Sequence, residues 1–253
     1  MSAVSILRSE IFGLIAMVLG FSLSLTSVRA TSLPGKDKAQ AAPTLRWAEG
    51  EPGCTFSRDD DGKYRYGLWT AGFGIVLAVD SQELEKVRRR AEHILSLELT
   101  VRYRGDGSLD VAPANFSLEF VKHYNDIHRT LDPDEMIDKQ NSEAQTLPGE
   151  TARAIRKHPE KQSEKEAAMA ARKQDIAQMI EFLTARALRS IKLDSANPET
   201  TGWIFFSTQS KWIDDLRKQE EFVLRIPVGD RVMEFPFLLP PGEGDLLLRR
   251  RPE

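Results

Sequence analysis

The sequence predicts a mainly β protein, an antiparallel β-sandwich with a long α-helical insertion between two of its strands. Two observations predict the sandwich. Apolar and polar residues alternate in several short segments that Gly, Pro and Asp residues separate, and one β-hairpin near the end of the chain has a single favourable register. A third observation, the helical spacing of apolar residues around residue 180, predicts the insertion.

The hairpin extends from Glu221 to Leu238. Gly229 and Asp230 separate two apolar runs, and Gly at the first central position favours a two-residue type II′ turn. A slip of one residue would place apolar side chains opposite charges. The pairs that this turn predicts are Ile226 with Met233, Leu224 with Phe235, Phe222 with Phe237 and, on the other face, Arg225 with Glu234. We expect the apolar face to pack on a second sheet, because an isolated hairpin is marginally stable in water.

Residues 1–30 have the pattern of an export signal peptide. Arg8 precedes an apolar run from Ile11 to Leu25, and Val28-Arg29-Ala30 provides small residues at the cleavage positions. The run is shorter than a membrane-spanning helix, which needs about 20 residues. We therefore expect cleavage, no membrane span afterwards, and a periplasmic or extracellular location; an uncleaved N-terminal anchor is the alternative. Residues 31–52, rich in Ala, Pro, Gly and Lys, predict a flexible linker.

The composition argues against a nucleic-acid partner. The chain has 35 Lys and Arg and 38 Asp and Glu, a net charge of −3. Loss of residues 1–30 removes Arg8, Arg29 and Glu10 and leaves a net charge of −4. Cys54 is the sole cysteine, so no intramolecular disulfide is expected. We interpret it as a small buried apolar residue, and an intermolecular disulfide stays open.

The folded domain is predicted to span residues 53–240, followed by a tail at 241–253. Besides the hairpin, the expected strands are Lys63–Trp69, Phe73–Val79, Leu95–Arg104, Leu109–Phe120, Ser190–Leu193 and Trp203–Ser207. Ser81 is expected to begin a short helix that ends near Ala91. Asp59-Asp60-Asp61-Gly62 resembles half of a calcium loop, but Leu68 stands where the last ligand, a Glu, is required. A solvated turn is therefore predicted.

The helical insertion is predicted between residues 132 and 189. Asp132-Pro133-Asp134-Glu135 has a capping residue, a Pro at the first helical position and acidic groups in the first turn, which predict a short helix. A longer helix is expected from Pro159 to about Arg189, with an apolar stripe of Ile176, Met179, Ile180, Leu183 and Ala187. Its first half is polar, so we expect that half to project into solvent or to pair with Thr151–Lys157.

No motif for catalysis or for cofactor binding is found in the sequence. A nucleophile-and-base motif such as Gly-x-Ser-x-Gly is missing, and so is a phosphate-binding loop. His123 and His128 are five residues apart, which places them on opposite faces of a strand and favours ordinary histidines at the rim over a metal site. The sequence thus predicts no catalytic residues, no cofactor and no metal.

One loop is the best candidate for a binding surface. It combines hydroxyl groups, an amide, a cation and an indole between a hydrophobic strand and the final hairpin, and it consists of Ser207, Thr208, Gln209, Ser210, Lys211 and Trp212. Such a set could hold a polar ligand. The alternative is that Trp212 covers one end of the core while the polar residues satisfy the backbone of a turn.

Part of the pattern resembles a known family. Val101-x-Tyr103-x-Gly105-Asp106-Gly107 before Asn115-Phe116-x-Leu118, and later Gly202-x-Ile204-x-Phe206, resembles the strand pattern of immunoglobulin-like domains in exported bacterial proteins of unknown function. The resemblance covers about half of the mature chain and implies an immunoglobulin-like sandwich. It brings no catalytic residues, and the helical insertion departs from the family pattern.

These observations lead to one expected function and one alternative. We expect an exported, non-catalytic binding or structural protein whose partner is a protein or another component of the cell envelope. The alternative is a ligand-binding or metal-binding protein, or an enzyme, with its site between the helical insertion and the sandwich. The sequence leaves the oligomeric state and the identity of the partner open.

Overall fold

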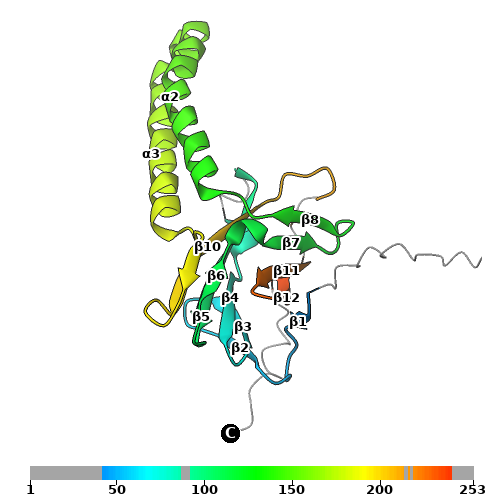
Figure 1. Ribbon diagram of the computed structural model, residues 1–253. Coiled ribbons are helices and arrows are strands. Elements are labelled where there is room, and N and C mark those ends of the chain that lie inside the picture. The colour runs from blue at the N-terminus through cyan, green and yellow to red at the C-terminus, as the bar shows by residue number, and fades with distance from the viewer. Residues whose placement is uncertain (1–41, 87–91, 214–215, 217–218, 241–253) are drawn as a thin grey trace, which may run out of the picture. The chain divides into compact units, whose positions relative to one another are not determined.

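The computed structural model describes residues 42–86, 92–213, 216 and 219–240. The predicted signal peptide at residues 1–30, the first part of the predicted linker and the tail at residues 241–253 lie outside the described residues. Within them the protein is mostly β, with several antiparallel sheets and two long helices (Figure 1).

The first sheet contains the final hairpin. It has five strands in the order β1-β12-β11-β7-β8. Their bounds are Thr44–Arg46 for β1, Ser117–Phe120 for β7, Asp126–Arg129 for β8, Glu220–Val228 for β11 and Arg231–Leu239 for β12. β1 runs parallel to β12, and the other neighbours are antiparallel.

The register of the final hairpin is confirmed in full. Every predicted pair is present: Ile226 with Met233, Leu224 with Phe235, Phe222 with Phe237, and Arg225 with Glu234. Gly229 has a φ of 62°, the positive value that the first central residue of this turn requires. On the outer face, Nε of Arg225 donates to Oε1 of Glu234 at 2.9 Å, and Arg225 also pairs with Glu119 of β7.

The prediction that residues 31–52 form a flexible linker is wrong for residues 44–47, which belong to the folded domain. Thr44–Arg46 forms β1, and the side chain of Trp47 is buried in the core. Nε1 of Trp47 donates to the Thr55 carbonyl at 3.0 Å, and its ring meets the ring of Tyr66 edge to face. A segment of three residues has too few apolar positions to show a period, so the sequence pattern could not reveal this strand.

The second sheet has five antiparallel strands in the order β10-β5-β4-β3-β2. Their bounds are Cys54–Arg58 for β2, Lys63–Trp69 for β3, Phe73–Asp80 for β4, Ile94–Tyr103 for β5 and Glu199–Ser207 for β10. A small third sheet pairs β6 (Leu109–Val111) with β9 (Ile191–Leu193). The predicted strand from Leu109 to Phe120 is therefore two strands, β6 and β7, and the 3-10 helix η2 (Pro113–Asn115) separates them.

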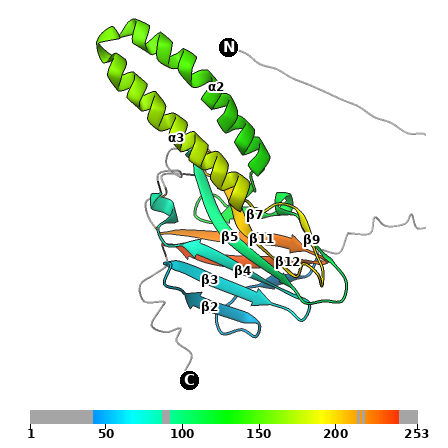
Figure 2. The same ribbon diagram turned by 90° about the vertical axis from the view of Figure 1, so that its left-hand side faces the viewer.

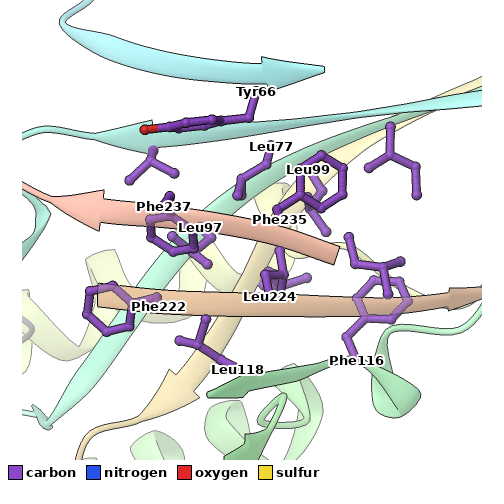
Figure 3. Packing of buried hydrophobic residues seen from close by; sticks show 14 of the residues in the cluster. Tyr66, Leu77, Leu97, Leu99, Phe116, Leu118, Phe222, Leu224, Phe235 and Phe237 are labelled. Carbon is purple, nitrogen blue, oxygen red and sulfur yellow. The ribbon is translucent and has the colours of Figure 1, made fainter. Parts of the chain in front are cut away.

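One hydrophobic core joins the two large sheets. Figure 3 shows side chains from both sheets in this core. Tyr66, Leu77 and Leu99 come from the second sheet, and Leu224 and Phe235 come from the first. These apolar side chains are almost fully shielded from water, and burial of each side chain contributes about 1.5 to 3 kcal/mol. Two mainly antiparallel sheets that share one core agree with the predicted sandwich.

Two helices lie between β8 and β9 in the chain. They are α2 (Pro133–Lys157) and α3 (Gln162–Arg186), and the 3-10 helix η3 (Pro159–Lys161) joins them. Both views show α2 and α3 side by side (Figures 1 and 2). The predicted cap is present, because Oδ1 of Asp132 accepts from the Asp134 N–H at 2.8 Å. The prediction of a short first helix is wrong, since α2 continues through Pro148.

The helices contact the second sheet at their base. Leu183 of α3 is fully buried together with Ile94 and Phe205, and Met136 and Ile137 of α2 pack against this cluster. Ion pairs of Arg172 also connect the two helices to the second sheet. Arg172 of α3 donates to Glu143 of α2 at 2.6 Å and to Glu92, just before β5, at 2.7 Å.

The short helix predicted from Ser81 to Ala91 is smaller in the structure. A single 3-10 turn, η1, spans Glu83–Glu85, and residues 87–91 lie outside the described residues. Glu83 is fully buried, and its Oε1 accepts from the backbone N–H and the hydroxyl of Ser96 at 2.9 and 2.6 Å. Nζ of Lys86 lies 2.7 Å from its other oxygen.

Candidate functional site

Strand pairing brings two connections to the same end of the first sheet. Phe120, the last residue of β7, pairs with Phe222 near the start of β11. The turn after β7 (residues 121–125) and the connection before β11, which contains the candidate loop at 207–212, therefore lie next to one another.

A carboxylate joins these two connections. The hydroxyl of Ser210 donates to Oδ2 of Asp126 at 2.6 Å, and Nε2 of His128 lies 3.0 Å from the same oxygen. The hydrogen bond from Ser210 is the main cause that holds the pKa of Asp126 below its usual value of 3.8, and His128 adds to it. Because Asp126 stands between Ser210 and His128, the serine donates to a carboxylate and not to a histidine base. This arrangement orders the loop and does not activate a nucleophile.

Two exposed aromatic rings come from the same two connections. The rings of Tyr124 and Trp212 meet edge to face with centroids 5.4 Å apart, although 84% and 46% of these side chains are exposed. Nζ of Lys211 lies 4.3 Å from the centre of the Trp212 ring, which is within the range of a cation–π contact. We call Tyr124, Lys211 and Trp212 the aromatic surface.

The structure divides the predicted loop into exposed and buried parts. Lys211 and Trp212 belong to the aromatic surface, and the hydroxyl of Ser210 accepts from the Trp212 N–H at 3.2 Å. Ser207 closes β10, and its hydroxyl accepts from the Gln209 N–H at 3.1 Å, so this end of the loop satisfies its own backbone. Thr208 is buried, and its hydroxyl oxygen has no hydrogen-bond partner among the described residues. The structure thus brings part of the predicted loop to the surface and turns Thr208 inward.

Sequence reasoning missed the residues that come from the turn after β7. Tyr124 and Asn125 both have positive φ values, 59° and 53°, in this turn. His123 is buried rather than at the rim, and its Nε2 lies 2.9 Å from Oε2 of Glu220. An aromatic residue inside a polar turn, as in Lys122-His123-Tyr124-Asn125, was the one signal in the sequence. Its contact with Trp212 depends on strand pairing between distant segments.

A second feature is a pocket of about 360 Å³ at the free edge of β10, where α2 begins and α3 ends. Its lining includes Leu131, Asp134, Leu188, Arg189 and Phe205. The pocket lies where the alternative function expected a site, between the helices and the sheets. None of the residues of the predicted loop lines it.

Two other features are not found within the described ranges. No group of three or more His, Cys, Asp or Glu side chains there is placed to hold a metal ion. None of the described helices combines the length and the apolar character needed to cross a bilayer.

Comparisons with known proteins do not assign a family. No family model matches the sequence, and no curated protein matches it. Among solved structures, the chain is similar to the crystal structure of the yjhA protein from Bacillus subtilis, with 13% sequence identity. The similarity covers 62% of this chain and 75% of that chain, at a TM-score of 0.28. That score is too low to establish a shared fold.

Proposed function

We propose that this protein is an exported, non-catalytic binding protein of the cell envelope that contacts a protein or another envelope component through its aromatic surface. One observation carries the proposal. Two of the four large hydrophobic residues that are exposed in the described part of the chain, Tyr124 and Trp212, are in contact, with ring centroids 5.4 Å apart. Clustered exposed apolar side chains mark interaction sites.

The chemistry of this surface suits binding. Tyr and Trp are the residues that most often dominate binding energy at interfaces, because each buries a large rigid area and has a polar group at one end. The edge-to-face contact and the bond between Ser210 and Asp126 already hold the loop in place. A partner therefore meets a partly ordered surface, which reduces the entropy cost of binding.

An immunoglobulin-like sandwich is our proposal for the finer fold. The residues that carry the sequence resemblance lie in β5, η2, β7 and β10, and Phe116, Leu118, Ile204 and Phe206 of this set are buried in the common core. The hydroxyl of Tyr103 accepts from the Gly107 N–H at 2.8 Å and closes the turn that the pattern contains. In this interpretation α2 and α3 are an insertion between two strands.

Export is supported by the sequence of the first 30 residues. A short apolar run after Arg8 that ends in Val28-Arg29-Ala30 is typical of a cleaved signal peptide. A periplasmic or extracellular protein meets envelope components directly, so the proposed location and the proposed role agree.

A binding experiment with matched variants tests the role. The mature protein is incubated with the isolated envelope fraction of its own cells, and the amount that sediments is measured. We expect saturable binding, and we expect a combined Tyr124→Ala and Trp212→Ala variant to lose at least about 2 kcal/mol of binding free energy. The control is Ile191→Ala, since Ile191 is 39% exposed but belongs to β9. Equal binding of all three proteins, or binding by none, would overturn the proposal.

The pocket at the edge of β10 favours a second candidate, a protein that binds a small ligand between the helices and the sheets. Its volume of about 360 Å³ is within the range of small-molecule sites. The two candidates use different residues and are compatible in one protein.

A further inference from the structure

The aromatic surface is formed by two neighbouring connections and not by the face of a sheet. Tyr124 belongs to the turn between β7 and β8, and Lys211 and Trp212 belong to the connection before β11. A stable interface between two proteins buries about 800 Å² on each partner, whereas one buried aromatic side chain contributes about 150 to 250 Å². The aromatic surface alone is therefore small for a protein partner. A lipid surface adapts to two exposed rings and needs no matching shape.

The backbone of Tyr124 favours a role for its side chain outside the fold. Its φ of 59° is in the left-handed region, which is uncommon for residues other than Gly, Asn and Asp. The next residue, Asn125, has a φ of 53° and suits this conformation. The side chain of Tyr124 is 84% exposed, so burial in the core does not offset the strain. Strained residues of this kind cluster at functional sites.

The two exposed rings have the amphipathic character that suits the interface of a bilayer. A Tyr ring has a hydroxyl at one end, and a Trp ring has an indole N–H. Both residue types are enriched where the hydrocarbon of a membrane meets the headgroups, because the apolar ring and the polar end each find a favourable environment there. The rings of Tyr124 and Trp212 are in contact, so they present one apolar area to a lipid surface.

The sequences of the two connections have a charge opposite in sign to that of the mature chain, which is −4. The turn at residues 121–125 has one charged residue, Lys122. The connection at residues 207–219 has three basic residues and two acidic ones: Lys211, Arg217, Lys218, Asp214 and Asp215. Four basic and two acidic residues give these connections a net charge of +2. Basic residues near a membrane are attracted to its anionic lipids.

The two described lysines lie at the aromatic surface or beside it. Nζ of Lys211 is 4.3 Å from the centre of the Trp212 ring, and Lys211 is exposed. Nζ of Lys122, next to Tyr124 in the chain, donates to the Gln219 carbonyl in the connection before β11. A lysine can lay its apolar stem along an apolar surface while its ammonium group reaches a lipid phosphate. The lysines and the rings thus suit the same partner.

We propose that the envelope component bound by the aromatic surface is an anionic phospholipid bilayer. The rings of Tyr124 and Trp212 enter the interface between the headgroups and the acyl chains, and Lys122 and Lys211 face the lipid phosphates. This inference rests on the proposed function, because it names the partner of the same surface. The protein then lies on the membrane through this end of the first sheet.

Sedimentation of the mature protein with protein-free vesicles tests the proposal. Vesicles of phosphatidylethanolamine mixed with phosphatidylglycerol are compared with vesicles of phosphatidylcholine alone. We expect saturable binding to the anionic vesicles, about tenfold or more tighter than to the neutral ones, and we expect it to weaken as salt is added. Equal binding to both kinds of vesicle, or binding to neither, would overturn the proposal.

Matched variants assign vesicle binding to the aromatic surface. The combined Tyr124→Ala and Trp212→Ala variant should weaken binding to anionic vesicles about tenfold or more, whereas Ile191→Ala, at an exposed position of β9, should not. Lys211→Gln removes one charge and should weaken binding about fivefold. Its control is Lys192→Gln, at an exposed position of β9, which should leave binding nearly unchanged. Equal effects of the test and control variants would contradict the assignment.

Fluorescence quenching by brominated lipids measures whether Trp212 enters the bilayer. The chain has four Trp residues. Anionic vesicles with brominated acyl chains, at a lipid concentration that saturates binding, should quench the emission of the wild type. Trp212→Phe should remove most of this quenching, because Trp212 is the Trp of the aromatic surface. Quenching that is unchanged in Trp212→Phe would show that this residue does not enter the membrane.

The envelope experiment described above separates this inference from the proposed function. If the protein sediments with the envelope fraction through Tyr124 and Trp212 but does not bind protein-free vesicles, its partner is an envelope protein. The proposed function then holds and the lipid inference is wrong. If the protein binds neither the envelope fraction nor the vesicles, both are wrong.

Discussion

The hydroxyl of Ser210 donates a 2.6 Å hydrogen bond to Oδ2 of Asp126, and this bond links two connections that are 84 residues apart in the chain. Since Asp126 is the first residue of β8 and Ser210 belongs to the loop before β11, the bond fixes the loop to an ordered strand. The rings of Tyr124 and Trp212, which come from the same two connections, are in contact.

The Asp126 carboxylate should make the order of the loop depend on pH. Its pKa in the folded protein lies below the usual 3.8, mainly because of the hydrogen bond from Ser210, so its contribution is present above about pH 4 and is lost as the pH falls through the lowered pKa. We expect Asp126→Asn to reduce the protection of the Trp212 amide against hydrogen exchange at pH 7. At a pH low enough to protonate Asp126, the variant and the wild type should converge. A difference that does not shrink at any acidic pH at which the protein stays folded would contradict this assignment.

Glu83 should be a large single contribution to the stability of the second sheet. Removal of its carboxylate leaves the N–H and the hydroxyl of buried Ser96 without their acceptor. We expect Glu83→Ala to lower the free energy of unfolding by about 2 to 3 kcal/mol, as measured by urea denaturation. Glu83→Gln keeps one acceptor oxygen and should cost clearly less. Equal losses in both variants would show that the hydrogen bonds to Ser96 are not the cause.

Arg225 connects three strands on the outer face of the first sheet. It pairs with Glu119 of β7 and with Glu234 of β12. Burial alone would raise the pKa of Glu234, but the hydrogen bonds from Arg225 and Arg46 outweigh it and hold the pKa below 4.5. Arg225→Ala should therefore destabilise the protein by about 1 to 2 kcal/mol at pH 7. The loss should shrink as the pH falls and Glu234 becomes protonated; a loss that does not shrink at any acidic pH at which the protein stays folded would indicate lost packing instead.

The base of α3 should matter for stability, whereas its first turns should not. Leu183 is fully buried against Phe205, so Leu183→Ala should cost about 2 to 5 kcal/mol in thermal or urea unfolding. A combined replacement of Ile180 and Leu183 by Asp should unfold the domain. Charge reversals at Lys161 and Lys165, where α2 connects to α3, are the control and should change stability by less than about 0.5 kcal/mol. A harmless Leu183→Ala would show that the helices do not stabilise the sheets.

Processing of the N-terminus can be checked by mass spectrometry of the protein isolated from its own cells. We expect the mature chain to begin at Thr31, because Val28-Arg29-Ala30 provides the cleavage site. A chain that still begins at Met1, in the soluble cytoplasmic fraction, would contradict export. A chain that begins at Met1 in the membrane fraction would favour the uncleaved anchor.

Local information was enough for the final hairpin and not for the helices. The turn residues Gly229 and Asp230 fix the register of β11 and β12, and each pair follows by counting. The sequence pattern predicted a short first helix, but α2 continues through Pro148 and Gly149 to Lys157. A Pro removes one helical hydrogen bond, and the packing of α2 along α3 compensates for it. Because this packing is a contact between two separate segments of the chain, the local pattern of α2 alone could not predict it.

Only part of the candidate site could be predicted from the sequence, because the rest depends on contacts between distant segments. The composition of residues 207–212 suggested a binding loop, and Lys211 and Trp212 are on the surface. Tyr124 and Asp126 reach them because β7 pairs with β11, a contact between segments about 100 residues apart. No local pattern reveals such a pairing.

The parallel pairing of β1 with β12 determines how the domain bears mechanical load. The chain enters β1 at Thr44 and leaves β12 at Leu239, and these two points lie at opposite ends of the paired strands. A force that pulls them apart acts along the strands and shears their contacts together, among them the bond from the Trp47 N–H to the Glu234 carbonyl and the ion pair of Arg46 with Glu234. Antiparallel strands pulled from one end would instead separate one bond at a time. A force that pulls Thr44 and Leu239 apart therefore loads all contacts between β1 and β12 at the same time.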